Sequence, residues 1–301
     1  MINKTVKDIL QNYSEHKLLS YKGNRPMPDR DSIIDIIDDV KNVMFPGYFR
    51  SENVAGDFAE YYTGQQIAHI YNNLKIQIKK AFSYRNTDNL SDDEIAERAN
   101  SISNHFISEL PKVQNVLMTD VQAGFDGDPA AQSMEDIIYS YPGLFAIFVY
   151  RIAHVLYCEK VPFIPRMMTE YAHGLTGIDI NSGATIGEYF FIDHGTGIVI
   201  GETCIIGNNV KLYQGVTLGA LSTRSGQQLA GVKRHPTIEN NVTIYSGASI
   251  LGGETVIGEE SIIGGNCFVT ASVPPRTKVT LKEPELIFKG PKTTTQSNWE
   301  I

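Results

Sequence analysis

A histidine and two aspartates in the C-terminal half of the chain have the spacing of a general base with carboxylate partners. Asp193 directly precedes His194, and Asp179 lies fifteen residues before His194. An imidazole can take a proton from a hydroxyl at neutral pH, and a nearby carboxylate orients the ring and stabilises its charged form. Fifteen residues is a little under one coil of the repeat described below, so we predict that Asp179 stacks close to His194.

A second group of chemically capable side chains stands at the end of a long segment, residues 219–236. Arg234 carries a planar guanidinium, which can bind a carboxylate through two parallel hydrogen bonds. His235 follows it directly, and Glu202 could orient that second imidazole as another dyad. Gly and Ser in the segment predict a movable loop that closes over a bound substrate and excludes water.

The elements that must position these side chains follow from an internal repeat. Every sixth residue is apolar from Ile180 to Val216, and the pattern resumes from Ile238 after a break at 219–236. A period of six is typical of short extended segments joined by turns, with one side chain per segment in a narrow shared interior. The sequence therefore predicts a parallel β-helix. The predicted interior positions are Ile180, Ile186, Ile192, Ile198, Cys204, Val210, Val216, Ile238, Ile244, Ile250, Val256, Ile262 and Phe268.

The chain before residue 176 has a different character, with apolar residues at helical spacing. Ser32 is expected to cap a helix that begins there, and Ser91 with Glu94 has the pattern of a capping box. Pro142 and Pro162 predict breaks between helices. The predicted helices cover residues 31–45, 57–83, 91–110, 113–124, 143–158 and 163–173.

Composition and charge exclude several classes of protein. The 301 residues carry a formal net charge of −8, which argues against a nucleic-acid partner. No apolar run is long enough to cross a membrane, and the N-terminus lacks the apolar stretch of a secretory signal. Three cysteines without a CxxC pattern argue against disulfides and a cysteine-based metal site. We therefore expect a cytoplasmic protein without a membrane partner or a bound metal.

Three short motifs narrow the family. Residues 193–203, DHGTGIVIGET, resemble the signature of the serine acetyltransferases, which belong to the hexapeptide-repeat acyltransferases. Residues 233–236, KRHP, and residues 120–129, DVQAGFDGDP, are similar to further motifs of that family. The resemblance implies an α+β fold in which an all-helical domain precedes a left-handed parallel β-helix. The expected parts are a helical oligomerisation and substrate domain at 1–175, the β-helix at 176–275 with its loop at 219–236, and a C-terminal segment with a flexible tail at 276–301.

The resemblance also implies an activity and roles for individual residues. The family transfers the acetyl group of acetyl-CoA to the hydroxyl of L-serine, giving O-acetyl-L-serine and CoA in cysteine biosynthesis. The implied catalytic residues are His194 and Asp179. The implied serine-binding residues are Asp193 and Asp128 for the amino group, with Arg234 and His235, and the implied acetyl-CoA contacts are Ala220, Ser246 and Gly265.

Partners are implied as well. Active sites of the family lie between subunits of a homotrimer, and two trimers often join through their helical domains. A C-terminal isoleucine, here Ile301, can insert into O-acetylserine sulfhydrylase.

The sequence departs from the family pattern at two places. Asn181 and Ser182 stand where the family usually has His-Pro, and the 219–236 loop is longer than usual.

Three alternatives stay open at this stage. A related acetyltransferase could act on a sugar, an amino sugar or homoserine. A β-helical carbonic anhydrase would hold zinc through three histidines, for which His173, His194 and His235 are the only candidates near the repeats. A structural trimer without catalytic activity would leave the charged residues around His194 unexplained.

Overall fold

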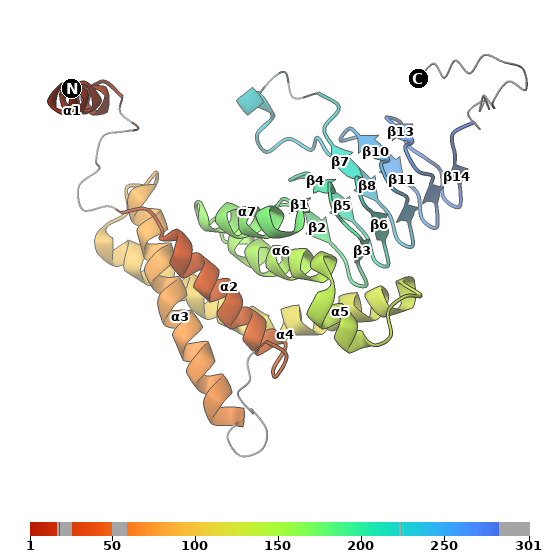
Figure 1. The fold of residues 1–301 in the computed structure, drawn as a ribbon, viewed down its shortest axis with the longest axis horizontal. Helices are drawn as coiled ribbons and strands as arrows, with labels where there is room; N and C mark the ends of the chain where they lie inside the picture. The colour runs from red at the N-terminus through yellow and green to blue at the C-terminus, as the bar shows by residue number, and fades with distance from the viewer. Residues whose placement is uncertain (17, 19–25, 50–58, 223, 225, 283–301) are drawn as a thin grey trace, which may run out of the picture.

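The computed structural model describes residues 1–16, 18, 26–49, 59–222, 224 and 226–282. In the described residues, seven α-helices are followed by short parallel strands that stack into a coil (Figure 1). The predicted fold class, a helical part followed by a left-handed parallel β-helix, is confirmed. The helices are α1 (Ile2–Glu15), α2 (Arg30–Met44), α3 (Ala59–Tyr84), α4 (Asp92–Gly127), α5 (Met134–Ser140), α6 (Pro142–Cys158) and α7 (Ile164–Thr176).

Two local predictions in the helical part need correction. Asp29, and not Ser32, caps α2, because the Asp29 carboxylate accepts the Ser32 N–H at 2.8 Å. The predicted helices 91–110 and 113–124 form one helix, α4, which contains Pro111. Proline costs α4 one backbone hydrogen bond, but Leu110 and Val113 on either side of it are both buried, and that packing offsets the loss. The predicted capping box of Ser91 and Glu94 is formed.

The strands form three parallel sheets, which are the three faces of the β-helix. Sheet one contains β1 (Asp179–Ile180), β4 (Val199–Ile200), β7 (Thr217–Gly219), β10 (Ser249–Leu251) and β13 (Phe268–Val269). Sheet two contains β2 (Thr185–Ile186), β5 (Ile205–Ile206), β8 (Thr237–Ile238) and β11 (Val256–Ile257). Sheet three contains β3 (Phe191–Asp193), β6 (Lys211–Tyr213), β9 (Thr243–Ile244), β12 (Ile262–Ile263) and β14 (Lys278–Val279).

Three of the predicted interior positions are wrong. Phe268 is 70% exposed and Ile262 is 36% exposed, and Val256 is only partly buried. The interior is filled instead by the residue that follows each of them, Ile257, Ile263 and Val269. The spacing from Ile250 to Ile257 is seven residues, because the turn at Gly252 holds one extra residue. Both members of each pair are apolar, so the sequence pattern fitted either register.

The first coil of the β-helix is longer than the second, and the difference lies at His194. Asp179 pairs with Val199, twenty positions on, whereas Val199 pairs with Thr217, eighteen positions on. The two extra residues belong to the turn between β3 and β4, where His194 has φ 58° and Gly195 has φ 88°. A positive φ is costly for a residue with a Cβ, and such strain is typical of functional sites. The two extra residues therefore lengthen this turn, and His194 is its first residue.

A buried ion pair joins the helices to the β-helix. The Arg151 guanidinium of α6 donates to both carboxylate oxygens of Asp120 in α4, at 2.6 and 2.8 Å. Arg151 also donates to the carbonyl of Gly187 at 2.8 Å, and Asp120 accepts the Phe190 N–H at 2.9 Å. These bonds fix α4 and α6 against the first coil, so residues at the ends of both helices have defined positions beside the β-helix.

Among the described residues no single helix has the length and apolar character to span a membrane, although α5 and α6, bent by 73° at their junction, meet that test as a pair.

Candidate active site

His194 lies on one edge of the β-helix, between sheets three and one. Its side chain is 70% exposed, and its Nε2 lies 3.7 Å from Asp193 Oδ1. Asp193 is 8% exposed, and its other carboxylate oxygen lies 3.8 Å from Lys211 Nζ. The turns of this "His194 edge" comprise residues 194–198, 214–216, 245–248 and 264–267.

The end of helix α4 brings Asp128 to the same edge. The Tyr141 hydroxyl donates to Asp128 Oδ2 at 2.7 Å, and the Ala130 N–H donates to Oδ1 at 2.8 Å. These two hydrogen bonds, followed by the charges of Lys211 and His194, hold the pKa of Asp128 below its ordinary value. The Asp128 carboxylate is therefore ionised at neutral pH, and the charges of both Asp128 and Asp193 act on the Tyr141 hydroxyl that donates to Asp128.

Asp179 makes no hydrogen bond or ion pair with His194 within the described part of the chain. Its ladder neighbour is Val199, and its ion pair is with Arg166 Nη1 of α7 at 3.6 Å. His194 belongs to the extended turn, whereas the strand residue paired with Asp179 is Val199. The neighbours of the two are nevertheless adjacent, because a Cβ at Gly195 would lie 2.4 Å from Ile178 Cδ1. Among the described residues Asp179 and His194 share no ion pair, and their predicted pairing stays a prediction.

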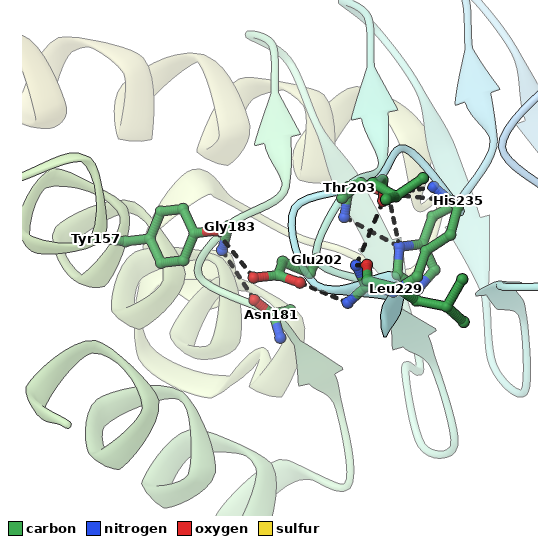
Figure 2. A network of polar contacts seen from close by, with 9 residues as sticks. Tyr157, Asn181, Gly183, Glu202, Thr203, Leu229 and His235 are labelled. Carbon is green, nitrogen blue, oxygen red and sulfur yellow. Dashed lines mark hydrogen bonds and ion pairs between the residues drawn. The ribbon is translucent and has the colours of Figure 1, made fainter. Parts of the chain in front are cut away.

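A second cluster lies on another edge, between sheets one and two (Figure 2). The turns of this "His235 edge" comprise residues 181–184, 201–204, 220–236 and 252–255. Arg234 Nη2 donates to Glu202 Oε2 at 2.5 Å, and Arg234 Nη1 donates to the carbonyl of Leu229 at 3.1 Å. The Arg234 side-chain bond holds the pKa of Glu202 below its usual range. Arg234 is thus fixed as a cation within the loop.

His235 is held as a neutral imidazole. The Thr203 N–H donates to His235 Nδ1 at 3.0 Å, so this nitrogen is an acceptor and Nε2 carries the proton. Burial, followed by the charge of Arg234, lowers the pKa of His235 to about 4. The ring lies directly on Gly201, where a Cβ would come within 2.1 Å of His235 Cδ2. The expected second dyad is not formed in this chain, because Glu202 bonds to Arg234 and Thr203 takes the place beside His235.

Lys233 fastens the end of the loop to the β-helix. Its ammonium donates to the carbonyls of Thr203 at 2.7 Å and Pro236 at 3.1 Å, and to that of His235. All three hydrogens of the ammonium are used in these bonds. Lys233 therefore stabilises the loop and is not free to bind a phosphate.

The three implied acetyl-CoA residues lie on both edges. Ser246 and Gly265 are neighbours on the His194 edge, where a Cβ at Gly265 would meet the Ser246 carbonyl at 3.2 Å. Ala220 opens the loop on the His235 edge. The small side chains at Ser246 and Gly265 leave backbone accessible there, which fits the close approach of an extended ligand.

The described residues contain one group with the composition of a metal site, formed by Glu170, His173 and Asp179, with their ligand atoms within 4.8 Å of one another. The Arg166 guanidinium already contacts both Glu170 and Asp179. His194 and His235 lie on different edges, so within one chain the three histidines of the carbonic anhydrase alternative do not meet.

Several contributors were not predicted from the sequence. Tyr141 and Tyr157 come from the helical part and donate to Asp128 and Glu202, respectively. Thr203 organises the His235 edge through its N–H and hydroxyl, and Lys211 lies beside Asp193. The Thr203 position lies inside the 193–203 motif and was a usable signal, whereas the tyrosines have no motif that marks them.

Comparisons with known proteins find serine acetyltransferases both by sequence and by structure. The plasmid-encoded serine acetyltransferase of Synechococcus elongatus is 41% identical over 234 residues, which cover 75% of this chain and 73% of that protein. The serine acetyltransferase of Bacillus subtilis is 51% identical over 126 residues, a match that spans 55% of its length. The structure of Entamoeba histolytica serine acetyltransferase 1 in complex with L-cysteine superposes with a TM-score of 0.72 and 35% identity, covering 81% of this chain and 86% of that one.

No protein-family model matches the chain. The similarity to the cyanobacterial protein nevertheless extends over most of both sequences, and the Entamoeba enzyme shares the order of helices and β-helix. This chain therefore belongs to the serine acetyltransferase family.

Proposed function

We propose a division of labour between the two edges in the serine O-acetyltransferase reaction of this chain. The observation that carries it is the meeting of Asp128, Asp193 and His194 on one edge, while Arg234 and His235 are fixed on the other. Two carboxylates suit the ammonium group of serine, and a guanidinium suits its carboxylate. His194, exposed and close to both carboxylates, takes the hydroxyl proton.

The chemical steps follow from these positions. Asp128 and Asp193 hold the serine ammonium, and His194 removes the proton from the serine hydroxyl while the serine oxygen attacks the thioester carbonyl of acetyl-CoA. The tetrahedral intermediate then collapses: the C–S bond breaks, the acetyl group stays on the serine oxygen and CoA leaves as a thiolate. His194 then returns the proton to the thiolate of CoA. The neutral His235 presents its Nε2–H as a hydrogen-bond donor toward the substrate. We assign to Asp179 the orientation of His194, as the family resemblance implies.

The separation of the edges supports a site built from two chains. Sheet one lies between the His194 edge and the His235 edge, so one chain offers two half-sites that face different directions. A homotrimer would place the His194 edge of one subunit beside the His235 edge of the next. Acetyl-CoA would then lie in the groove between them, against Ser246 and Gly265 of one chain and Ala220 of its neighbour.

Exposed apolar residues support further assembly. Helix α1 has no buried residue, although Val6, Leu10 and Tyr13 form an apolar strip along it. Such a strip in a short helix favours contact with another chain. We propose that the helical parts join two trimers.

Localisation and the sulfhydrylase partner are also proposals. We place the protein in the cytoplasm, because its three cysteines are free thiols and two of them are buried. Contact with O-acetylserine sulfhydrylase would use Ile301, which lies outside the described residues. The L-cysteine complex of the Entamoeba enzyme suggests that L-cysteine competes with L-serine at the same site here.

One assay tests the identity of the acceptor. Purified protein is mixed with acetyl-CoA and L-serine, homoserine or an amino sugar, and thiol release is followed. We expect saturable release with L-serine and inhibition by L-cysteine. Preference for an amino sugar, which lacks the carboxylate, would overturn the roles given to Arg234, Asp193 and Asp128. Preference for homoserine, which carries both the ammonium and the carboxylate, would overturn L-serine as the acceptor.

A further inference from the structure

A hydrogen-bond chain runs from the helical part of the molecule to Arg234, and Figure 2 labels its first two members, Tyr157 and Glu202. The Tyr157 hydroxyl, near the end of α6, donates to Glu202 Oε1 at 3.0 Å. The other oxygen, Glu202 Oε2, accepts from Arg234 Nη2 at 2.5 Å. Each oxygen of the Glu202 carboxylate therefore has its own donor, and the carboxylate plane is defined by both.

The Tyr157 ring is itself fixed in place. It stacks on the His154 ring with 6.4 Å between centroids and 12° between planes. His154 is anchored in turn, because its Nδ1 lies 2.7 Å from the carbonyl of Ser182 in the first coil. The hydroxyl of Tyr157 is thus aimed at Glu202 by contacts on both the helix and the β-helix.

Gly183 provides the space that this chain of contacts needs. A Cβ at Gly183 would lie 2.7 Å from Tyr157 Cζ and 2.8 Å from Glu202 Cγ. The backbone there is not in the left-handed region, so turn geometry does not demand glycine at this position. Close approach of the phenol and the carboxylate is a sufficient reason for the missing side chain.

The charges of the three groups fit a fixed anchor. Burial, followed by the hydrogen bond to Glu202, raises the pKa of the Tyr157 phenol, so the phenol keeps its proton and remains a donor. The Arg234 bond lowers the pKa of Glu202, which keeps the carboxylate ionised. The neutral Tyr157 phenol therefore donates to the Glu202 carboxylate, and that carboxylate orients the positively charged Arg234 guanidinium.

We propose that Tyr157 is a positioning residue for the substrate carboxylate: it holds Glu202, and Glu202 aims the Arg234 guanidinium. This inference rests on the proposed role of Arg234 as the carboxylate anchor. It also gives the helical part a direct share in substrate binding, because α6 supplies the first member of the chain. Removing the phenol oxygen leaves Glu202 with one donor and lets Arg234 move, so binding of the serine carboxylate weakens while proton removal at His194 is unaffected.

The test compares acceptors with and without a carboxylate. For Tyr157→Phe we expect the KM for L-serine to rise about fivefold, the value of one ordinary hydrogen bond, with kcat and the KM for acetyl-CoA within about twofold of wild type. L-Serinamide lacks the carboxylate, so its kcat/KM should be the same in wild type and Tyr157→Phe. An equal fall in kcat/KM for both acceptors, or an unchanged KM for L-serine, would overturn the proposal. Tyr61→Phe is a matched control, because Tyr61 is 74% exposed on α3.

A double-mutant cycle shows whether Tyr157 affects L-serine binding through Glu202 or through a general effect on the structure. If Tyr157 acts through Glu202, Tyr157→Phe should change the L-serine KM less than about twofold in a Glu202→Gln background. Additive effects in the double variant would contradict the relay. If Arg234→Ala leaves the preference for L-serine over L-serinamide unchanged, the carboxylate anchor is wrong. If wild type releases no thiol with L-serine, the proposed function fails first, so the two failures are distinguishable.

Discussion

The two edges beside sheet one are built in opposite ways. On the His194 edge, two extra residues lengthen a turn whose histidine is 70% exposed, and the Nε2 of that histidine lies 3.7 Å from Asp193 Oδ1. On the His235 edge, Arg234 and His235 are tied by several hydrogen bonds to Thr203, Glu202 and the loop backbone. A side chain that takes a proton from the substrate and later returns it must be accessible to the substrate. Side chains that only bind the substrate work best when their positions are fixed before binding.

The largest expected effect is on the exposed edge. His194→Ala should lower kcat by about 10²–10⁴-fold, the range found for a general base, in a steady-state assay of thiol release. The melting temperature should hardly change, because the side chain is largely exposed. Near-normal turnover in this variant would remove His194 from the mechanism.

The fixed edge should be sensitive to its backbone. Gly201→Ala places a Cβ 2.1 Å from His235 Cδ2, so the ring must move. We expect kcat/KM for L-serine to fall by about 10²-fold, as for a misplacement near 1 Å. Gly174→Ala is the matched control, since a Cβ there meets nothing within 4 Å. Unchanged kinetics of Gly201→Ala would show that the position of His235 does not matter.

The lysine that fastens the loop gives a smaller effect. Lys233→Met removes three bonds to carbonyls, and we expect a loss of about 1–2 kcal/mol in the free energy of unfolding, measured by urea denaturation. Lys112→Met, at an exposed position on α4, should change it by less than about 0.5 kcal/mol. Equal stabilities of the two variants would mean that the loop end is held by other contacts.

The smallest expected effect is the pH dependence from the neutral imidazole. The folded-state pKa of His235 is about 4, and an unfolded histidine titrates near 6.5, so the unfolded chain binds more protons between these values. The free energy of unfolding should therefore fall as the pH is lowered from about 6.5 to 4, by about 1 kcal/mol after allowance for solvent screening. His235→Asn should flatten this slope, and an unchanged slope would assign it to other groups.

The fold could be predicted because the six-residue period and the 193–203 motif are both patterns within short stretches of the sequence. The register beyond Ile250 was not predictable, since Val256–Ile257 and Ile262–Ile263 offer an apolar residue in either frame. The pairing of Glu202 was also missed: Glu202 was expected to orient His235, but the loop brings the Arg234 guanidinium to its carboxylate instead. Tyr157 and Gly183 contribute through packing between distant segments, which one sequence does not reveal.

The central claim is that each active site combines the His194 edge of one chain with the His235 edge of another. Two variants altered on different edges, His194→Ala and Arg234→Ala, can be unfolded together, refolded as a mixture and assayed at an L-serine concentration at which each variant alone turns over far more slowly than wild type. In randomly mixed trimers about a quarter of the sites would have both edges intact, so the mixture should recover about a quarter of the wild-type activity. A mixture as inactive as its two components would show that the two edges do not meet between chains.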